Sequence, residues 1–308
     1  MHKTVTTKEN VSFPGMGHII VMVLIHPRLL TRGIRCISTV VRKFFLFQYR
    51  SALFPRLPVS NAEHALDEKI PFNPCFVRIY LDFVAVWVRI VGFLGIGFGK
   101  PGRKLAADFI TSITELYLFA FQIYRKNLST TARPNYKKGW HFRLIHLLDP
   151  HLMCIPSLHI MLMIHSYTAF RHYLVTLNKE KYYNDLVSKV FNGALLITEA
   201  VLYIKQHSIN CIAAALYTMN RLHPDLFSAA DAECFVCSLF KTRKPDEIPP
   251  EYAMFYSDPF VAPEDTAKLQ EYIICLFRFF RDKESSDWTA PLLEYLETLP
   301  LAELSQPG

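Results

Sequence analysis

The sequence predicts an all-α fold: a bundle of about six helices, expected to lie in a membrane, followed by a soluble, acidic, helix-containing tail. The composition is the first reason, because 51% of the 308 residues are hydrophobic and only 20% are charged, whereas about 25% of an ordinary soluble domain is charged. The second reason is a series of apolar stretches, each close to the roughly 20 residues that cross a bilayer. The third is a division of charge along the chain, which separates the bundle from the tail.

Basic residues gather in the first 221 residues, which contain 27 Lys and Arg against 11 Asp and Glu, a net charge of +16. Residues 222–308 contain 7 basic and 16 acidic residues, a net charge of −9. A hydrophobic and basic region suits anionic lipid headgroups or phosphate esters, and we expect no nucleic-acid partner, because nucleic-acid binding uses basic clusters on a polar surface. We therefore divide the chain into a hydrophobic, basic N-terminal segment (1–60), a helical membrane core (61–221) and an acidic tail (222–308), whose partner the sequence does not identify.

The first half of the chain contains three apolar elements. Residues 10–27 hold no Asp, Glu, Lys or Arg and a basic segment follows them, so we expect a short hydrophobic element with a cationic flank. Residues 76–99 predict a long apolar helix that ends at a Gly-Lys-Pro-Gly run, since glycine and proline terminate helices. Residues 105–124 predict a second helix, in which Asp108 and Glu115 lie on one face, and that face must meet protein or water rather than lipid.

Helices also dominate the second half. Residues 150–170 are the longest run without a charged side chain, and they predict a helix over 156–174 with its proline in the first turn, where proline is tolerated. Further apolar helices are expected over 187–204 and 207–220. In the tail, residues 264–283 show the spacing of apolar residues that is typical of an amphipathic helix.

Three separated motifs lie near the ends of these helices. The first is a lysine and an Arg-Pro pair with six residues between them, the second is a Pro-Ser-Leu-His run, and the third is a Lys-Gln-His run. They consist of Lys126 with Arg133-Pro134, of Pro156-Ser157-Leu158-His159, and of Lys205-Gln206-His207. With the helices assigned as above, all three motifs fall on the same face of the membrane.

In their order and intervals these motifs resemble those of the type 2 phosphatidic acid phosphatase superfamily. Its patterns are K-x6-RP, then PSGH, then SR-x5-H-x3-D, and the resemblance covers about residues 75–220. It implies a helical membrane fold and the cleavage of phosphate esters through a phosphohistidine, with no metal and no cofactor. By resemblance, His207 is the nucleophile and His159 is the general acid. The residues implied to bind the substrate phosphate are Lys126, Arg133, Ser157, Leu158 and Lys205.

The residue types also suit a phosphate site on physical grounds. Fixed cations and backbone N–H groups stabilise the charge on phosphoryl oxygens in the transition state. Arginine supplies a planar pair of donors and lysine supplies a point charge, while the start of a helix at Ser157 adds backbone donors. Two histidines can then divide nucleophilic attack and protonation of the leaving group. The remaining histidines, His151 among them, are expected to be structural or interfacial.

The third motif departs from the family pattern. Ala200 and Val201 stand where the family has Ser-Arg, and Cys211 stands where it has the aspartate that accepts a hydrogen bond from the nucleophilic histidine. A thiol is a poor acceptor, and the absent arginine leaves Lys205 as the candidate to replace it. Nearby acceptors for the imidazole are Asn210 and Glu199, and the sequence does not choose between them. Catalysis is therefore more open to question than the fold.

The expected function is hydrolysis of a lipid phosphate, such as phosphatidate, phosphatidylglycerophosphate or a polyprenyl diphosphate. One alternative is transfer of a lipid headgroup, because a phosphohistidine can pass its phosphoryl group to an alcohol instead of water. Another is a catalytically decayed membrane protein that only binds phosphate. Basic residues near the opposite ends of the helices favour an extracytoplasmic active site and a cytoplasmic tail.

Overall fold

The computed structural model describes residues 13–136, 138–241, 243 and 262–302. These residues are mostly helical, which confirms the all-α prediction at the level of fold class. Two helical segments, Pro74–Gly97 and Asn184–Tyr203, are long and apolar enough to cross a membrane. The transmembrane bundle of about six helices stays a prediction.

The α-helices are, in chain order, α1 (Met16–Ile25), α2 (Pro27–Thr39), α3 (Leu46–Leu53), α4 (Val77–Leu81), α5 (Phe83–Gly97), α6 (Gly99–Tyr124), α7 (Trp140–Leu148), α8 (Leu158–Thr176), α9 (Asn184–Tyr203), α10 (Ile209–Leu222), α11 (Ala229–Cys237), α13 (Thr266–Asp282) and α14 (Ala290–Thr298). The other elements are a π-helix η1 (Val40–Phe45), the 3-10 helices η2 (Ala65–Lys69), η3 (Pro74–Phe76) and η4 (Glu180–Tyr182), and the strands β1 (Val59–Asn61) and β2 (Leu128–Thr130).

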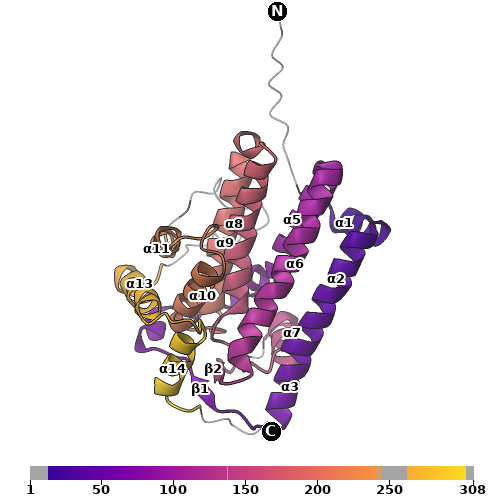
Figure 1. Cartoon of the computed structure of the whole chain (residues 1–308). Coiled ribbons are helices and arrows are strands. Elements are labelled where there is room, and N and C mark those ends of the chain that lie inside the picture. Colours follow the sequence, from indigo (N-terminus) through magenta and orange to yellow (C-terminus); the bar gives the residue numbers. More distant parts are fainter. Residues whose placement is uncertain (1–12, 137, 242, 244–261, 303–308) are drawn as a thin grey trace, which may run out of the picture.

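The core is a bundle of α5, α6, α8, α9 and α10. Helix α5 packs on α6 and α8, and α8 also packs on α9 and α10. Figure 1 shows α1 to α3 along one side of this bundle and α11, α13 and α14 along the other. The facing side chains are apolar and buried, and burial of one such side chain stabilises a fold by about 1.5–3 kcal/mol. The helices expected over 156–174, 187–204, 207–220 and 264–283 correspond to α8, α9, α10 and α13.

The helix expected over 105–124 begins earlier than the sequence suggested, at Gly99. The proline of the Gly-Lys-Pro-Gly run lies in the first turn of α6, where its missing N–H is not needed. Gly102 allows this turn to pack closely on α5, because an added Cβ would lie 2.0 Å from the Leu94 carbonyl oxygen. Asp108 and Glu115 are both exposed on this helix.

Residues 27–53 form one nearly continuous helical rod, made of α2, η1 and α3. Its outward apolar residues recur at intervals of three, four, five, three and four, and they are Ile34, Ile37, Val41, Leu46, Tyr49 and Leu53. The interval of five coincides with the π-helix, whose wider turn keeps the residues on one face. Exposed arginines run beside this stripe at Arg28, Arg35, Arg42 and Arg50. The rod therefore presents an apolar surface next to a cationic one.

The acidic tail, expected as a separate appendage, packs on the core instead. Helix α13 lies against α10, and the Tyr272 hydroxyl donates a hydrogen bond to Asn210 Oδ1 at 2.7 Å. Near the chain end, the Ser60 hydroxyl donates to the Leu296 carbonyl oxygen at 2.8 Å. Net charge distinguishes the tail from the core, but apolar side chains on both join them in one interior.

A buried ion pair fastens the tail to α9. Arg243 donates to both carboxylate oxygens of Glu199, at 2.6 and 2.9 Å, and the side chains are 4% and 0% exposed. The backbone N–H of Phe240 also donates to Glu199 at 2.7 Å. A buried charge is tolerated when it is paired and hydrogen-bonded in this way.

Replacement of Glu199 by alanine should strongly destabilise the protein. The change leaves Arg243 buried without its main partner, so we expect a loss of about 3–5 kcal/mol in the free energy of unfolding. Chemical denaturation in detergent measures it. Glu233→Ala, which removes an exposed carboxylate paired with Arg278, is the control and should change stability little. Equal stability of the two variants would contradict the structural role of the buried pair.

Candidate active site

A short backbone ladder brings the first two motifs together. Strand β2 follows α6 and pairs in parallel with β1, with Ser129 opposite Ser60. On its other side, Ser129 N–H donates to the Leu152 carbonyl at 3.0 Å, and Cys154 N–H donates to the Ser129 carbonyl at 3.2 Å. The Ser129 hydroxyl accepts a further bond from Ile155 N–H at 2.8 Å. The segment that leads to Arg133 is thereby joined to the loop that leads to the second motif.

Side chains from two helices hold this second loop in place. Gln48 of α3 is fully buried, and its Oε1 accepts a hydrogen bond from Leu152 N–H at 2.7 Å. The hydroxyl of Tyr124, at the end of α6, donates to the carbonyl of Pro156. The next residue, Ser157, is the N-cap residue of α8. This arrangement fixes where α8 begins and places His159 in its first turn.

The third motif enters the site through the turn between α9 and α10. After α9 ends, Lys205 takes a left-handed conformation with φ of 55°, which reverses the chain within a few residues. The N–H groups of Gln206 and His207 then donate to the Val201 carbonyl, at 2.9 and 3.2 Å. His207 is 8% exposed as a result.

Two histidines meet at the centre of the site. His207 Nε2 lies 3.3 Å from His159 Nδ1 and 3.2 Å from the Ser157 hydroxyl. The Tyr80 and Phe83 rings pack against His159, with ring centroids 4.7 and 4.5 Å away. Residues far apart in the sequence, which the motifs assigned to nucleophile and acid, are therefore within hydrogen-bond distance of each other.

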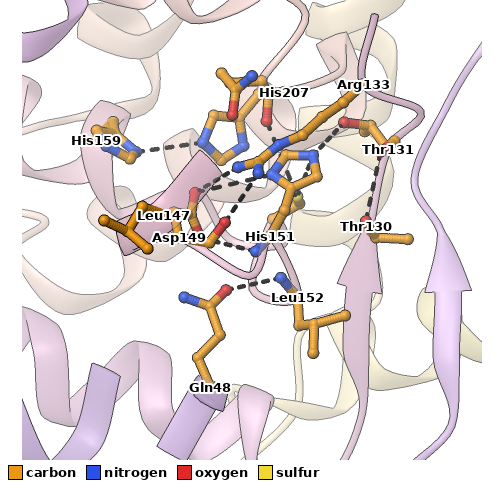
Figure 2. A network of polar contacts seen from close by, with 12 residues as sticks. Gln48, Thr130, Thr131, Arg133, Leu147, Asp149, His151, Leu152, His159 and His207 are labelled. Carbon is orange, nitrogen blue, oxygen red and sulfur yellow. Dashed lines mark hydrogen bonds and ion pairs between the residues drawn. The ribbon is translucent and has the colours of Figure 1, made fainter. Parts of the chain in front are cut away.

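A charged cluster lies beside the histidine pair (Figure 2). Arg133 Nη2 donates to Asp149 Oδ2 at 3.0 Å, and its Nη1 donates to the Asp149 backbone carbonyl at 2.9 Å. Asp149 Oδ1 accepts from the backbone N–H of His151 at 2.8 Å. The imidazole Nε2 of His151 lies 2.7 Å from the Thr131 hydroxyl. The ring centroids of His151 and His207 are 6.4 Å apart.

The electrostatics favour neutral histidines beside an ionised carboxylate. Burial lowers the pKa of His207 well below its usual range, and the neighbouring His159 and His151 add to this effect. Burial also lowers the pKa of His151, and the Arg133 charge lowers it further. Although burial raises the pKa of Asp149, hydrogen bonds from His151 and the Arg133 charge outweigh it and hold that pKa well below its usual range. A neutral imidazole is the form that attacks phosphorus.

Two neighbouring spaces, which share lining residues, lie beside the pair. The smaller, which we call the histidine hollow, has a volume of about 10 Å³ and is lined by Phe44, Asp149, His151, Met153, Cys154, Leu158, His159 and His207. The larger, the apolar cavity, measures about 170 Å³. It is lined mainly by apolar and aromatic residues of η1, α4, α5, α6 and α7, and it shares Phe44, Asp149, Leu158 and His159 with the hollow. Val84 and Leu148 line it and are 41% and 45% exposed, so the cavity reaches the surface.

The structure brings five of the seven expected site residues together. His207, His159, Ser157, Leu158 and Arg133 lie around the hollow. Lys205 does not join them, because its ammonium group donates to the carbonyls of Asp67 and Ile70, each at 2.6 Å. Lys126 is exposed just after the end of α6. There it lies near Asp287, whose pKa is lowered mainly by hydrogen bonds from Thr289 and, to a smaller extent, by the Lys126 charge.

The departures in the third motif leave His207 without an orienting group among the described residues. His207 Nδ1 is buried and has no hydrogen-bond partner among the described residues. Cys211 is buried in α10. The two alternative acceptors are engaged elsewhere: Asn210 binds Tyr272 and the Ala62 carbonyl, and Glu199 binds Arg243.

The sequence analysis did not single out Asp149, and it expected His151 to be structural or interfacial, which stays a prediction. Both lie in the Asp-Pro-His run between α7 and the second motif. The signal that could have found them is a single carboxylate that stands before 21 residues without charge, in the loop that leads to the Pro-Ser-Leu-His run. Among the residues that the structure describes, no three His, Cys, Asp or Glu side chains are grouped as metal ligands.

Comparisons with protein-family models, with curated proteins and with solved structures find no match to this chain. The resemblance to the phosphatidic acid phosphatases therefore depends on the three motifs, and the chemistry must be argued from the site itself.

Mild acid should destabilise the protein through its buried histidines. Below about pH 6.5 the unfolded chain takes up protons at His151 and His207, while the folded chain resists protonation. Stability should therefore fall between pH 7 and 5, by up to about 1.4 kcal/mol per pH unit for each histidine. In His151→Gln the free energy of unfolding should change less steeply with pH. Thermal unfolding at several pH values measures this slope. Exposed His172→Gln is the control, and equal slopes in both variants would rule out the buried histidine as a source.

Proposed function

We propose that this protein hydrolyses a lipid phosphate through a phosphohistidine on His207. The observation that carries the proposal is the His159–His207 pair, 3.3 Å apart, beside the guanidinium group of Arg133. A nucleophile, a proton donor and a fixed cation are the three groups that phosphoryl transfer requires. The substrates in view are phosphatidate, phosphatidylglycerophosphate and polyprenyl diphosphates.

In the proposed reaction, His207 Nε2 attacks phosphorus and the bond to the lipid oxygen breaks. Because burial disfavours the charged form of a histidine, His159 takes up its proton together with the bound phosphate anion, which stabilises the imidazolium. It donates that proton to the oxygen as it leaves, and it then removes a proton from the water that hydrolyses the phosphohistidine. Arg133 and the backbone N–H groups at the start of α8 stabilise the charge on the phosphoryl oxygens. Leu158 contributes through its backbone, while its side chain faces the hollow and the apolar cavity.

The apolar cavity supports a lipid substrate rather than a small soluble ester. It runs from His159 to the surface between η1, α5 and α7, and apart from Asp149 and His159 its lining is apolar or aromatic. A hydrocarbon chain attached to the phosphate could lie there and gain about 0.8 kcal/mol for each buried CH₂ group. A polar leaving group would gain nothing from such a lining.

Two alternatives belong to the same proposal. Transfer to an alcohol instead of water would use the same phosphohistidine, and the identity of the acceptor would decide between hydrolysis and headgroup transfer. Phosphate binding without turnover is favoured by one specific observation: within residues 13–136, 138–241, 243 and 262–302, His207 Nδ1 has no acceptor. An acceptor at Nδ1 would stabilise the tautomer that carries its proton on Nδ1 and leaves Nε2 free to attack, and His207 has no such stabilisation from those residues.

The proposal includes a membrane location, with the active site outside the cytoplasm and the tail within it. Support comes from the two helical segments that are long and apolar enough to cross a bilayer. The exposed apolar stripe and arginine row of the rod add to it, because such a surface suits the boundary between lipid tails and anionic headgroups.

Substitution of the two histidines should separate their roles. We expect His207→Ala to lower kcat by at least about 10³-fold on every phosphate ester, since it removes the nucleophile. His159→Ala should lower kcat by about 10²-fold or more on a lipid phosphate and much less on p-nitrophenyl phosphate, whose leaving group needs no proton. Phosphate release by purified protein in detergent, with EDTA present, measures both.

The control for these variants is His165→Gln, at a buried histidine that bonds Ser112 outside the site. It should retain turnover. Activity in His207→Ala comparable to the wild type would eliminate the phosphohistidine mechanism, and phosphate binding with no turnover in the wild type would favour the binding protein.

Membrane attachment should survive alkaline carbonate. If Pro74–Gly97 and Asn184–Tyr203 cross the bilayer, the protein should stay in the membrane pellet at high pH and high salt. Release by carbonate, together with weaker binding in the double variant Arg35→Gln and Arg42→Gln, would show instead that the surface of the rod alone holds the protein to lipid.

A further inference from the structure

The anion-binding edge of Arg133 is already occupied by an anion. The Nη1 and Nη2 donors both go to Asp149, one to its backbone carbonyl and one to its carboxylate. The Arg133 Nε donor is buried and has no partner among the described residues. A phosphate that binds the Nη1 and Nη2 donors together must therefore compete with Asp149 for them, since the other pair of parallel donors includes the buried Nε.

The volume of the site leads to the same conclusion. The histidine hollow measures about 10 Å³, which is about the space that one water molecule needs. A phosphoryl group is several times larger. Asp149 is the one acidic side chain that lines both the hollow and the apolar cavity, so its departure would remove negative charge and open space in the same movement.

The local structure around Asp149 favours movement of its carboxylate away from Arg133. It is the C-cap residue of α7, where the carbonyl end of a helix disfavours a carboxylate. The next residue but one, His151, has a positive φ of 64°, which is unfavourable for a residue other than glycine. The Asp149 side chain is still 19% exposed, and the neighbouring Leu147 and Leu148 of α7 are exposed as well. Besides the hydrogen bond from His151 N–H, the contact with Arg133 holds the carboxylate inside.

We propose that Asp149 is an internal competitor of the substrate phosphate, which binds the Arg133 guanidinium group in the free protein and is displaced when a phosphate enters. This inference deepens the proposed function and rests on it, since it assigns phosphate binding to Arg133. Asp149 acts here through Arg133, so it is a positioning residue and takes no part in bond making. Its presence selects ligands that bind the guanidinium group more strongly than a carboxylate does.

The test is the affinity of the full-length protein for inorganic phosphate, measured by titration calorimetry in detergent at pH 7.5. Asp149→Asn keeps an acceptor for His151 N–H but removes the charge that competes for Arg133. We expect it to bind phosphate at least about tenfold more tightly than the wild type. Glu233→Gln, at an arginine-paired carboxylate on α11, should bind phosphate like the wild type.

A double-mutant cycle separates competition from a general loosening of the loop. In an Arg133→Gln background, Asp149→Asn should bring no gain in phosphate affinity. The inference is overturned if Asp149→Asn binds phosphate no more tightly than the wild type, if the gain persists without Arg133, or if no variant binds phosphate. Should Asp149→Asn fail to fold, Asp149→Ser, which also retains an acceptor for His151 N–H, takes its place under the same criteria.

Failure of the proposed function gives a different result. A protein in which Asp149→Asn gains phosphate affinity through Arg133, but in which no variant releases phosphate from a lipid, has the internal competitor and lacks the hydrolytic activity. Equal phosphate affinity in the wild type and Asp149→Asn, together with hydrolysis that depends on His207, would leave the activity in place and remove the competitor.

Discussion

The hydrogen bonds of Ser129 with the loop before α8 are the constraint on which the site depends. Its N–H, carbonyl and hydroxyl groups all bind that loop, while its strand pairs with β1 on the other side. One residue thereby connects the chain after α6, which carries Arg133, to the chain before α8, which carries Ser157 and His159. Because an unpaired buried backbone group is costly, this ladder leaves little freedom in how the first two motifs meet.

Burial then decides the chemistry that the residues can perform. His207 is enclosed by His159, His151 and Ser157, and desolvation keeps its imidazole neutral and able to act as a nucleophile. The same burial makes the unpartnered Nδ1 costly, since no acceptor in the part of the chain that the structure describes compensates its lost hydration. The site thus combines two close histidines with an incomplete support for one of them, and these two features point to turnover and to simple binding respectively.

The surroundings of the site come from segments that carry no motif. Gln48 and Phe44 belong to the N-terminal rod, and they hold the loop at Leu152 and line the hollow. On the opposite side, the tail is joined to α9 and α10 by Glu199–Arg243 and by Asn210–Tyr272. These contacts remove Glu199 and Asn210 from any role at His207. The tail and the rod therefore shape the site although neither contributes a reacting group.

The helical class and the main helices of the core could be predicted from the sequence, because periodicity depends on residues close in the chain. The grouping of His159, His207, Ser157 and Arg133 was an expectation from the resemblance of the three motifs to a known family. The tertiary structure alone decided that Lys205 turns toward Asp67, that Lys126 stays at the surface, and that Asp149 binds Arg133. The structure also shows that the tail packs on the core, whereas the difference in net charge had predicted a separate tail. Side-chain partners of this kind depend on which distant segments pack together, and neither composition nor spacing encodes the direction in which a long or charged side chain points.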